Sequence, residues 1–249
     1  MTDPPVRRAG TGALVLSVLG AGAIAAAGLA YVADHKVAPA PASAAASAKP
    51  TLMLLTSLPL VFGERFGLEG GGSPALKALE ARYTVTPVGV ADAETLKQGK
   101  LLLMAHPLAQ PAEALVDLDR WVRNGGRLLL LADPALEWPS ERPLGDALRP
   151  PPAFADTGLL RHWGLRLDAP ADRGPKLRML GGQEVLTSSP GALVGRCPVS
   201  RDGLVAHCPI GKGEATIIAD ADFLNLADLD GPTDKNLDSM LAELAALQR

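Results

Sequence analysis

The sequence predicts an α/β domain built on a mostly parallel β-sheet that helices cover on both faces. Three short segments, at 52–56, 100–104 and 128–132, are apolar except for Thr56 and Lys100 at their ends, which is typical of strands that are buried on both faces. Segments with a helical pattern separate these runs, and strands joined by crossover helices lie parallel to one another. We also expect an antiparallel hairpin near the C-terminus and one transmembrane helix ahead of the domain.

The first half of the domain is expected to alternate strand and helix. After the first apolar run, Ser73-Pro74 is typical of the cap and first position of a helix. A β-branched stretch at 83–90 follows. Asp92 is then expected to cap a short helix that runs to Lys97.

The clearest helix is predicted to begin at Pro111 and to end at Asn124-Gly125-Gly126, because these residue types tolerate the left-handed geometry of a helix end. Its apolar residues recur at the spacing of one helical face. They are Ala114, Leu115, Leu118, Trp121 and Val122.

The second half is richer in loops, with several prolines after Pro139. We expect a short helix over 156–163, antiparallel structure over 192–221, and a hairpin turn at Gly211-Lys212-Gly213. A last helix is predicted to start at Pro232 or Thr233. Its apolar stripe consists of Leu237, Met240, Leu241, Leu244 and Leu247.

Composition excludes several classes of protein. The 249 residues carry 24 basic and 27 acidic side chains, a net charge of −3, which gives no electrostatic footprint for nucleic-acid binding. Two cysteines and four histidines cannot form a cysteine-rich zinc site. The sequence indicates no cofactor.

The N-terminal segment is predicted to anchor the chain in a membrane. No charged side chain occurs over 9–33, and 25 residues form a helix of about 37 Å, long enough for a hydrocarbon core of about 30 Å. Arg7 and Arg8 precede the span and only Lys36 closely follows it, so residues 1–8 are expected in the cytoplasm and the remainder in the periplasm. We therefore expect a single-pass inner-membrane protein.

This segment has three alternative interpretations. The Arg7-Arg8 pair suggests a twin-arginine export signal, but Ala9-Gly10-Thr11 is a poor continuation of one. Ala42-Ser43-Ala44 and Ala46-Ser47-Ala48 look like cleavage sites of a signal peptide, although the apolar run exceeds the usual 7–15 residues. Gly20-Ala21-Gly22 with Ala25 has the spacing of a dinucleotide-binding turn but lacks the acidic residue expected about 20 positions later. The preferred organisation is a tail (1–8), a transmembrane helix (9–33), an Ala/Pro-rich tether (34–50) and a periplasmic domain (51–249).

The two cysteines flank a turn. Because 197 + 208 equals 202 + 203, a hairpin centred on Asp202-Gly203 places Cys197 directly opposite Cys208. Opposed Cβ atoms lie about 4.5–5.5 Å apart, close to disulfide reach, and an oxidising periplasm favours the bond. Two free thiols are the alternative.

Candidate binding residues follow the predicted strands, because ligands of open parallel sheets bind beyond the carboxyl ends of the strands. They are Thr56, Ser57, His106, Asp133, Asp220 and Asp222.

These residues suggest two kinds of chemistry, hydrolysis and metal binding. Ser57, His106 and Asp133 are nominally a nucleophile, a base and an orienting acid, which predicts a hydrolase as the alternative function. No G-x-S-x-G elbow exposes a serine, and capping of strands and helices explains the same residues. Asp220 and Asp222 without further oxygen ligands do not predict a metal site.

Two blocks of the chain resemble a known family. The block "LLLMAHPLAQPAEALVDLDRWVRNGGRLLLLADP" (101–134) and the block "GKGEATIIADADFLN" (211–225) resemble the periplasmic domain of gliding-motility-type ABC-transport auxiliary proteins. The opening "TSLPLVFGE" (56–64) looks like that of single-pass transport-system components. The resemblance covers about 170 residues.

The resemblance implies a flavodoxin-like sheet similar to class I glutamine amidotransferases. In that enzyme class a cysteine follows a central strand on a tight turn. Here the corresponding strand end is Met104-Ala105-His106-Pro107, with neither cysteine near it. This departure argues against amidotransferase or peptidase chemistry. It favours a non-catalytic binding or scaffold module of an ABC-type transport or envelope system, with permease and ATPase subunits as partners.

Overall fold

The computed structural model describes residues 48–63 and 72–249. The predicted transmembrane helix at 9–33 and nearly all of the tether lie outside these residues. No helix in the described part of the chain combines the length and apolarity that crossing a bilayer requires. Residues 49–249 form one compact unit.

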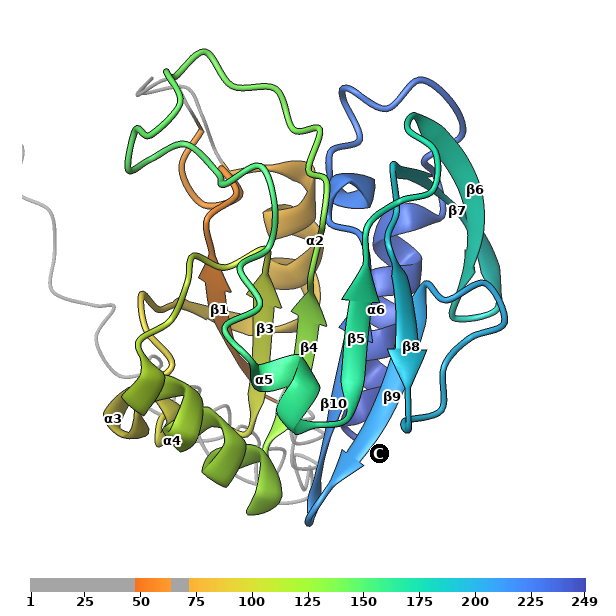
Figure 1. Cartoon of the computed structure of the whole chain (residues 1–249). Helices are drawn as coiled ribbons and strands as arrows, with labels where there is room; N and C mark the ends of the chain where they lie inside the picture. Colours follow the sequence, from red (N-terminus) through yellow and green to blue (C-terminus); the bar gives the residue numbers. More distant parts are fainter. Residues whose placement is uncertain (1–47, 64–71) are drawn as a thin grey trace, which may run out of the picture. The chain divides into compact units, whose positions relative to one another are not determined.

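A six-stranded sheet organises this unit, with the strand order β2-β1-β3-β4-β10-β9 (Figure 1). The first five strands in this order run parallel, and only β9 runs antiparallel to its neighbour β10. The mostly parallel sheet and the C-terminal antiparallel hairpin are thus confirmed. The bounds are β1 Thr51–Thr56, β2 Thr84–Pro87, β3 Leu101–Ala105, β4 Arg127–Leu131, β9 Val205–Ile210 and β10 Gly213–Ile218.

The central strands are apolar throughout because both faces of the sheet are covered. Leu52 and Leu54 of β1 pack into one core, and Met53 and Leu55 into the other. Helices α2 and α6 cover the first face, whereas α3, α4 and α5 cover the second. Their bounds are α2 Pro74–Arg82, α3 Ala93–Leu96, α4 Ala112–Arg123, α5 Leu159–His162 and α6 Asn236–Leu247, with a 3-10 helix η1 at Asp222–Leu224.

Two predicted helix starts are confirmed. The Ser73 hydroxyl accepts a hydrogen bond from the backbone N–H of Leu76, and the Asp92 carboxylate accepts one from Thr95. Each cap satisfies a donor that the first helical turn leaves without an intrahelical partner.

Two other helix boundaries were predicted wrongly. The last helix begins at Asn236, not at Pro232 or Thr233, because residues 234–235 form a turn in which the backbone N–H of Asn236 donates to the carbonyl of Thr233. Helix α5 begins at Leu159, not at residue 156, because Gly158 has a φ of 101°, which interrupts a right-handed helix.

Two small antiparallel pairs flank the main sheet. Strand β5 (Leu165–Asp168) pairs with β8 (Ala192–Gly195), and β6 (Pro175–Leu180) pairs with β7 (Gln183–Ser188). The prediction of wholly antiparallel structure over 192–221 is therefore only partly right. Strand β10 pairs antiparallel with β9 but parallel with β4, and this long-range pairing completes the main sheet.

The disulfide hairpin has the predicted register. Val199 pairs with Ala206, and the backbone N–H of His207 donates to the carbonyl of Pro198, so paired residue numbers sum to 405. In this register Cys197 faces Cys208, their Cα atoms lie 5.0 Å apart, and their sulfurs are bonded. The Gly211-Lys212 turn between β9 and β10 is also present.

Candidate functional site

The candidate residues at the end of β1 are tied to the end of β3. The Thr56 hydroxyl donates to the carbonyl of Ala105 over 2.8 Å and accepts from the backbone N–H of Leu58 over 3.0 Å. The Ser57 hydroxyl donates to the backbone carbonyl of His106. Ser57 therefore meets the main chain of His106, and its hydrogen bond does not involve the imidazole ring.

His106 is fully buried and has a φ of 47°, an uncommon conformation for a residue other than glycine. Its Nε2 lies 2.8 Å from the carbonyl oxygen of Pro151, whereas its Nδ1 has no hydrogen-bond partner. Burial lowers the pKa of this imidazole because the charged form loses its hydration. The ring holds the 139–158 loop against the end of β3.

Asp133, at the end of β4, binds backbone rather than His106. One carboxylate oxygen accepts from the N–H of Ala135 and the other from the N–H of Ala221, both over 2.8 Å. Burial raises the pKa of this carboxyl to about 6, although the backbone hydrogen bonds oppose the shift. Asp133 thus joins the loops that follow β4 and β10.

Asp220 and Asp222 extend this arrangement. Asp220 accepts hydrogen bonds from the backbone N–H groups of Phe223 and Ser188, and Asp222 accepts one from Glu137. Burial, with the charge of Asp133 as a smaller cause, raises the pKa of Asp222 to about 8 and that of Asp220 well above its usual range.

Glu137 also belongs to this network, but its pKa is lowered, whereas the pKa values of the three aspartates are raised. Its two carboxylate oxygens accept from the hydroxyls of Ser188 and Ser189 over 2.5 and 2.7 Å. The hydrogen bond from Ser188 is the main reason that its pKa is lowered. Through Glu137 and Asp220 the loops after β4, β7 and β10 are held together.

The structure consequently divides the predicted residues into two groups. Thr56, Ser57 and His106 lie at the ends of β1 and β3, whereas the three aspartates lie at the ends of β4 and β10. Across the described residues, no set of three or more histidine, cysteine, aspartate or glutamate side chains could hold a metal ion. The carboxylates serve as acceptors for backbone amides that would otherwise be buried without partners.

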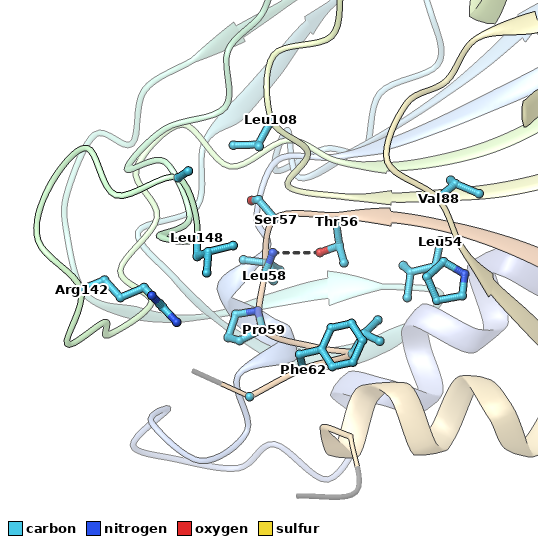
Figure 2. Close-up of a pocket in the computed structure, with 14 residues that line it drawn as sticks. Leu54, Thr56, Ser57, Leu58, Pro59, Phe62, Val88, Leu108, Arg142 and Leu148 are labelled. Carbon is cyan, nitrogen blue, oxygen red and sulfur yellow. Dashed lines mark hydrogen bonds between the residues drawn. The ribbon is translucent and has the colours of Figure 1, made fainter. Parts of the chain in front are cut away.

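An apolar pocket of about 340 Å³ opens beside the first group (Figure 2). Its floor includes Thr56 and Ser57, and its walls come from the loop after β1, the end of β2 and the 139–158 loop. Phe62 and Leu148 are 75% and 60% exposed, and Leu108 is 48% exposed. The pocket is lined mainly by Leu54, Leu58, Pro59, Val61, Phe62, Pro87, Val88, Leu108, Arg142 and Leu148.

The apolar residues of this pocket are not among the residues predicted from the sequence, which are all polar side chains at strand ends. A signal was present in Leu58-Pro59-Leu60-Val61-Phe62, an apolar run that directly follows a strand. Leu58 and Leu60 turn into the core, which leaves Phe62 exposed at the pocket.

Comparisons with known proteins bear on the fold alone. No protein-family model and no curated protein matches the chain. A cytoplasmic protein from Salmonella typhimurium LT2 is 12% identical with a TM-score of 0.50, and the match covers 79% of this chain and 99% of that one. The N-terminal domain of mmIFT52 is 13% identical with a TM-score of 0.49, covering 80% and 97% of the two chains.

Glycosidases are also among the similar structures. An exo-β-1,4-mannosidase from Opitutaceae bacterium strain TAV5 is 15% identical with a TM-score of 0.48, and the match covers 80% of this chain. The chain spans only about a third of the length of such enzymes, 36% for the mannosidase and 31% for a β-galactosidase from Bacillus circulans. Of these matches only the Salmonella protein reaches a TM-score of 0.50, and at 12% identity that similarity concerns the fold alone.

Proposed function

We propose that this chain is a membrane-anchored periplasmic binding or scaffold component of an ABC-type transport or envelope system, without catalytic activity of its own. The proposal rests on which groups the carboxyl end of the sheet presents to solvent. Its reactive side chains are engaged with backbone groups, and the feature that faces solvent is an apolar pocket. Such a pocket suits the apolar side chains of a partner protein.

The rim of the pocket supports binding of a protein segment. Phe62, Leu108 and Leu148 expose large apolar side chains around one opening. Exposed apolar clusters of this kind are typical of interaction sites, and aromatic side chains are enriched at the centres of interfaces. The permease and ATPase subunits named by the family resemblance are the proposed partners.

The disulfide supports the proposed compartment. Bonds between cysteines persist in oxidising environments such as the periplasm and are rare in the cytosol. The Cys197–Cys208 bond lies in the same unit as the pocket, so both would be on the periplasmic side of the predicted anchor.

The strand order supports a flavodoxin-like fold. The parallel strands follow the spatial order β2-β1-β3-β4-β10, which corresponds to the flavodoxin-like order 2-1-3-4-5. The strand end that would carry the amidotransferase nucleophile holds His106, while both cysteines are bonded to each other on the hairpin that leads into β9.

A periplasmic hydrolase that uses Ser57, His106 and Asp133 is the second candidate. The strained backbone and unpartnered Nδ1 of His106, next to Ser57, favour it. Its weakness is that Asp133 gives both oxygens to backbone amides. If Ser57→Ala, His106→Ala and Asp133→Asn each leave the cellular phenotype unchanged while the proteins stay folded, this candidate is excluded.

The leading proposal is tested by photo-crosslinking in membranes. A photoreactive phenylalanine analogue at position 62 should form adducts with the periplasmic part of a permease subunit; the ATPase, on the cytoplasmic side, should be recovered only through the permease. The same analogue at Leu177, which is 50% exposed on β6, is the matched control and should not form adducts. Phe62→Glu should reduce co-purification of the permease and Leu177→Glu should not. Solubilised membranes that never yield a permease or ATPase with the full chain would refute the proposal.

A further inference from the structure

Each of the five parallel strands is entered through a basic residue. Lys49 and Arg82 lie two residues before β1 and β2, Lys100 and Lys212 lie directly before β3 and β10, and Arg127 begins β4. Because the five strands run parallel, all five residues lie along the same edge of the sheet, the edge at the amino ends of the strands. We call these five residues the basic edge.

The spacing of the strands sets the dimensions of the basic edge. Neighbouring strands lie about 4.8 Å apart, so five strands span a row of about 19 Å. Hydrogen bonds between the segments that precede the strands maintain the row: the N–H of Arg127 donates to the carbonyl of Lys100, and the N–H of Lys212 donates to that of Arg123. The spatial order along the row is Arg82, Lys49, Lys100, Arg127 and Lys212.

Local electrostatics do not account for this row. Among the ion pairs of the described residues, only one involves the basic edge, a 3.8 Å contact between Arg127 and Glu214. The Lys49 ammonium donates to the backbone carbonyl of Glu80. Favourable interaction with a helix C-terminus explains Arg82 in the last turn of α2, but Lys100 and Lys212 lie in turns before strands.

The other charges at this edge are largely paired. Lys97 contacts Glu94 and Arg123 contacts Asp119, over 2.7 and 2.8 Å. Four of the five basic-edge residues are exposed, and Arg127 is partly buried. Their charge is therefore available to solvent and to an external partner.

A hollow of about 510 Å³ lies in the middle of the basic edge. Lys100 and Arg127 line it together with the polar residues Thr51, Gln98 and Gln248, two glycines, and Pro50, Leu101 and Leu247. Amide and cationic groups around an open hollow suit an anionic oxygen ligand such as a phosphate group. The carboxyl groups at the opposite end of the sheet are buried, whereas most side chains of the basic edge are exposed to solvent.

We propose that the basic edge docks on the anionic phospholipid headgroups of the membrane that holds the anchor. This inference rests on the proposed anchoring, because Lys49 is where the chain passes from the predicted tether into β1. The edge nearest the anchor in sequence is thus the one that carries the five basic residues, of which, among the described residues, only Arg127 is in an ion pair. Each Lys or Arg near an anionic surface strengthens attraction, and salt weakens it within a Debye length of about 10 Å. Docking would turn the carboxyl-end pocket away from the lipid surface, toward the periplasmic part of the proposed permease partner.

The test uses the full chain reconstituted in protein-free vesicles of phosphatidylcholine alone or mixed with phosphatidylglycerol. A membrane-impermeant amine reagent is applied, and acetylation of Lys100 and Lys212 is measured by mass spectrometry relative to exposed Lys77 at the opposite end of the sheet. We expect both lysines to react at least about threefold more slowly on phosphatidylglycerol vesicles at low salt, with the protection lost at about 500 mM salt.

Matched charge reversals identify the surface. Lys100→Glu with Arg127→Glu should abolish the protection of Lys212. Lys176→Glu with Lys235→Glu, the same charge change at the opposite end, should leave it intact. Circular dichroism checks that both variants are folded.

The outcomes separate the docking inference from the anchoring on which it rests. A chain that a high-salt wash removes from both kinds of vesicle refutes the anchor, and the proposed function with it. A chain that stays bound, but whose Lys100 and Lys212 react equally on both lipids, refutes docking alone. Protection that appears only in native membranes also overturns the inference, because a protein rather than lipid then covers the edge.

Discussion

The backbone N–H of Glu137 donates a 2.8 Å hydrogen bond to the carboxylate of Asp222, which lies 85 residues further along the chain. Asp222 is almost completely buried, and its pKa is raised to about 8 by burial first and by the charge of Asp133 second. Near neutral pH the side chain is therefore largely a protonated acid that still accepts a hydrogen bond through its other oxygen. The loops after β4 and β10 are joined by a group that titrates within the physiological range.

The raised pKa of Asp222 predicts an unusual dependence of stability on pH. Between its ordinary value of 3.8 and about 8, the folded protein holds a proton that the unfolded chain has lost. The contribution of Asp222 to the unfolding free energy therefore decreases as pH rises through this window, by up to about 1.4 kcal/mol per pH unit. Asp222→Asn keeps the acceptor and removes the titration, so its stability relative to the native protein should rise from pH 4 to pH 8.

Urea denaturation across this pH window measures the difference. Asp230→Asn, at an exposed loop position, is the control for loss of one carboxylate. If the unfolding free energies of Asp222→Asn and of the native protein change with pH in the same way, the titration does not belong to Asp222.

The parallel sheet could be predicted because its signal is local. Runs such as Leu101–Met104 and Leu128–Leu131 are buried on both faces and carry no polar residue, so they identify central strands without knowledge of the neighbours. The caps at Ser73 and Asp92 could be predicted for the same reason, since donor and acceptor lie three residues apart. The pairing of Cys197 with Cys208 could be predicted because the two residues are equally far in sequence from the centre of one turn.

The remaining features depend on contacts that are distant in sequence. The apparent strand pattern of β6 is weak, and the β6–β7 pair is fixed partly by Asn236, which binds Leu186 from 50 residues away. The candidate site divides into two groups because Asp133 finds its partner in Ala221 rather than in His106. Chain order placed Ser57, His106 and Asp133 in a plausible triad, and only the fold shows where their hydrogen bonds lead.

The hairpin disulfide predicts a moderate gain in stability. Cys197→Ser with Cys208→Ser should lower the unfolding free energy by about 2–3 kcal/mol, because the bond closes a loop with a sequence separation of 11. Chemical denaturation with and without dithiothreitol measures the effect. Reduced native protein and the double variant should have the same midpoint, and a midpoint of the native protein that is insensitive to reduction would disprove the prediction.

Two buried polar residues on α6 should respond in opposite ways to truncation. The Asn236 amide donates to the carbonyls of Leu186 and Phe223 and accepts from the N–H of Leu186. Asn236→Ala leaves these groups without partners and should cost about 2–4 kcal/mol. The buried Ser239 hydroxyl has no hydrogen-bond partner, so Ser239→Ala should leave stability unchanged or increase it. Thermal unfolding compares the two, and equal destabilisation would show that helix packing outweighs these hydrogen bonds.

The entry to β10 leaves no room for a side chain. A Cβ at Gly213 would overlap the backbone carbonyl oxygens of Val122 and Gly126, which cannot move without displacing the end of α4 and the start of β4. Gly213→Ala should therefore destabilise the domain by about 1–3 kcal/mol, as overpacking does. Gly89 has no atom within 4 Å of its Cβ position, so Gly89→Ala controls for the added methyl group and should be neutral or slightly stabilising. Urea denaturation of both variants decides the matter. If Gly213→Ala is as stable as Gly89→Ala, β10 does not approach α4 this closely. The position assigned to Lys212 in the basic edge would then be wrong as well, because Lys212 directly precedes Gly213.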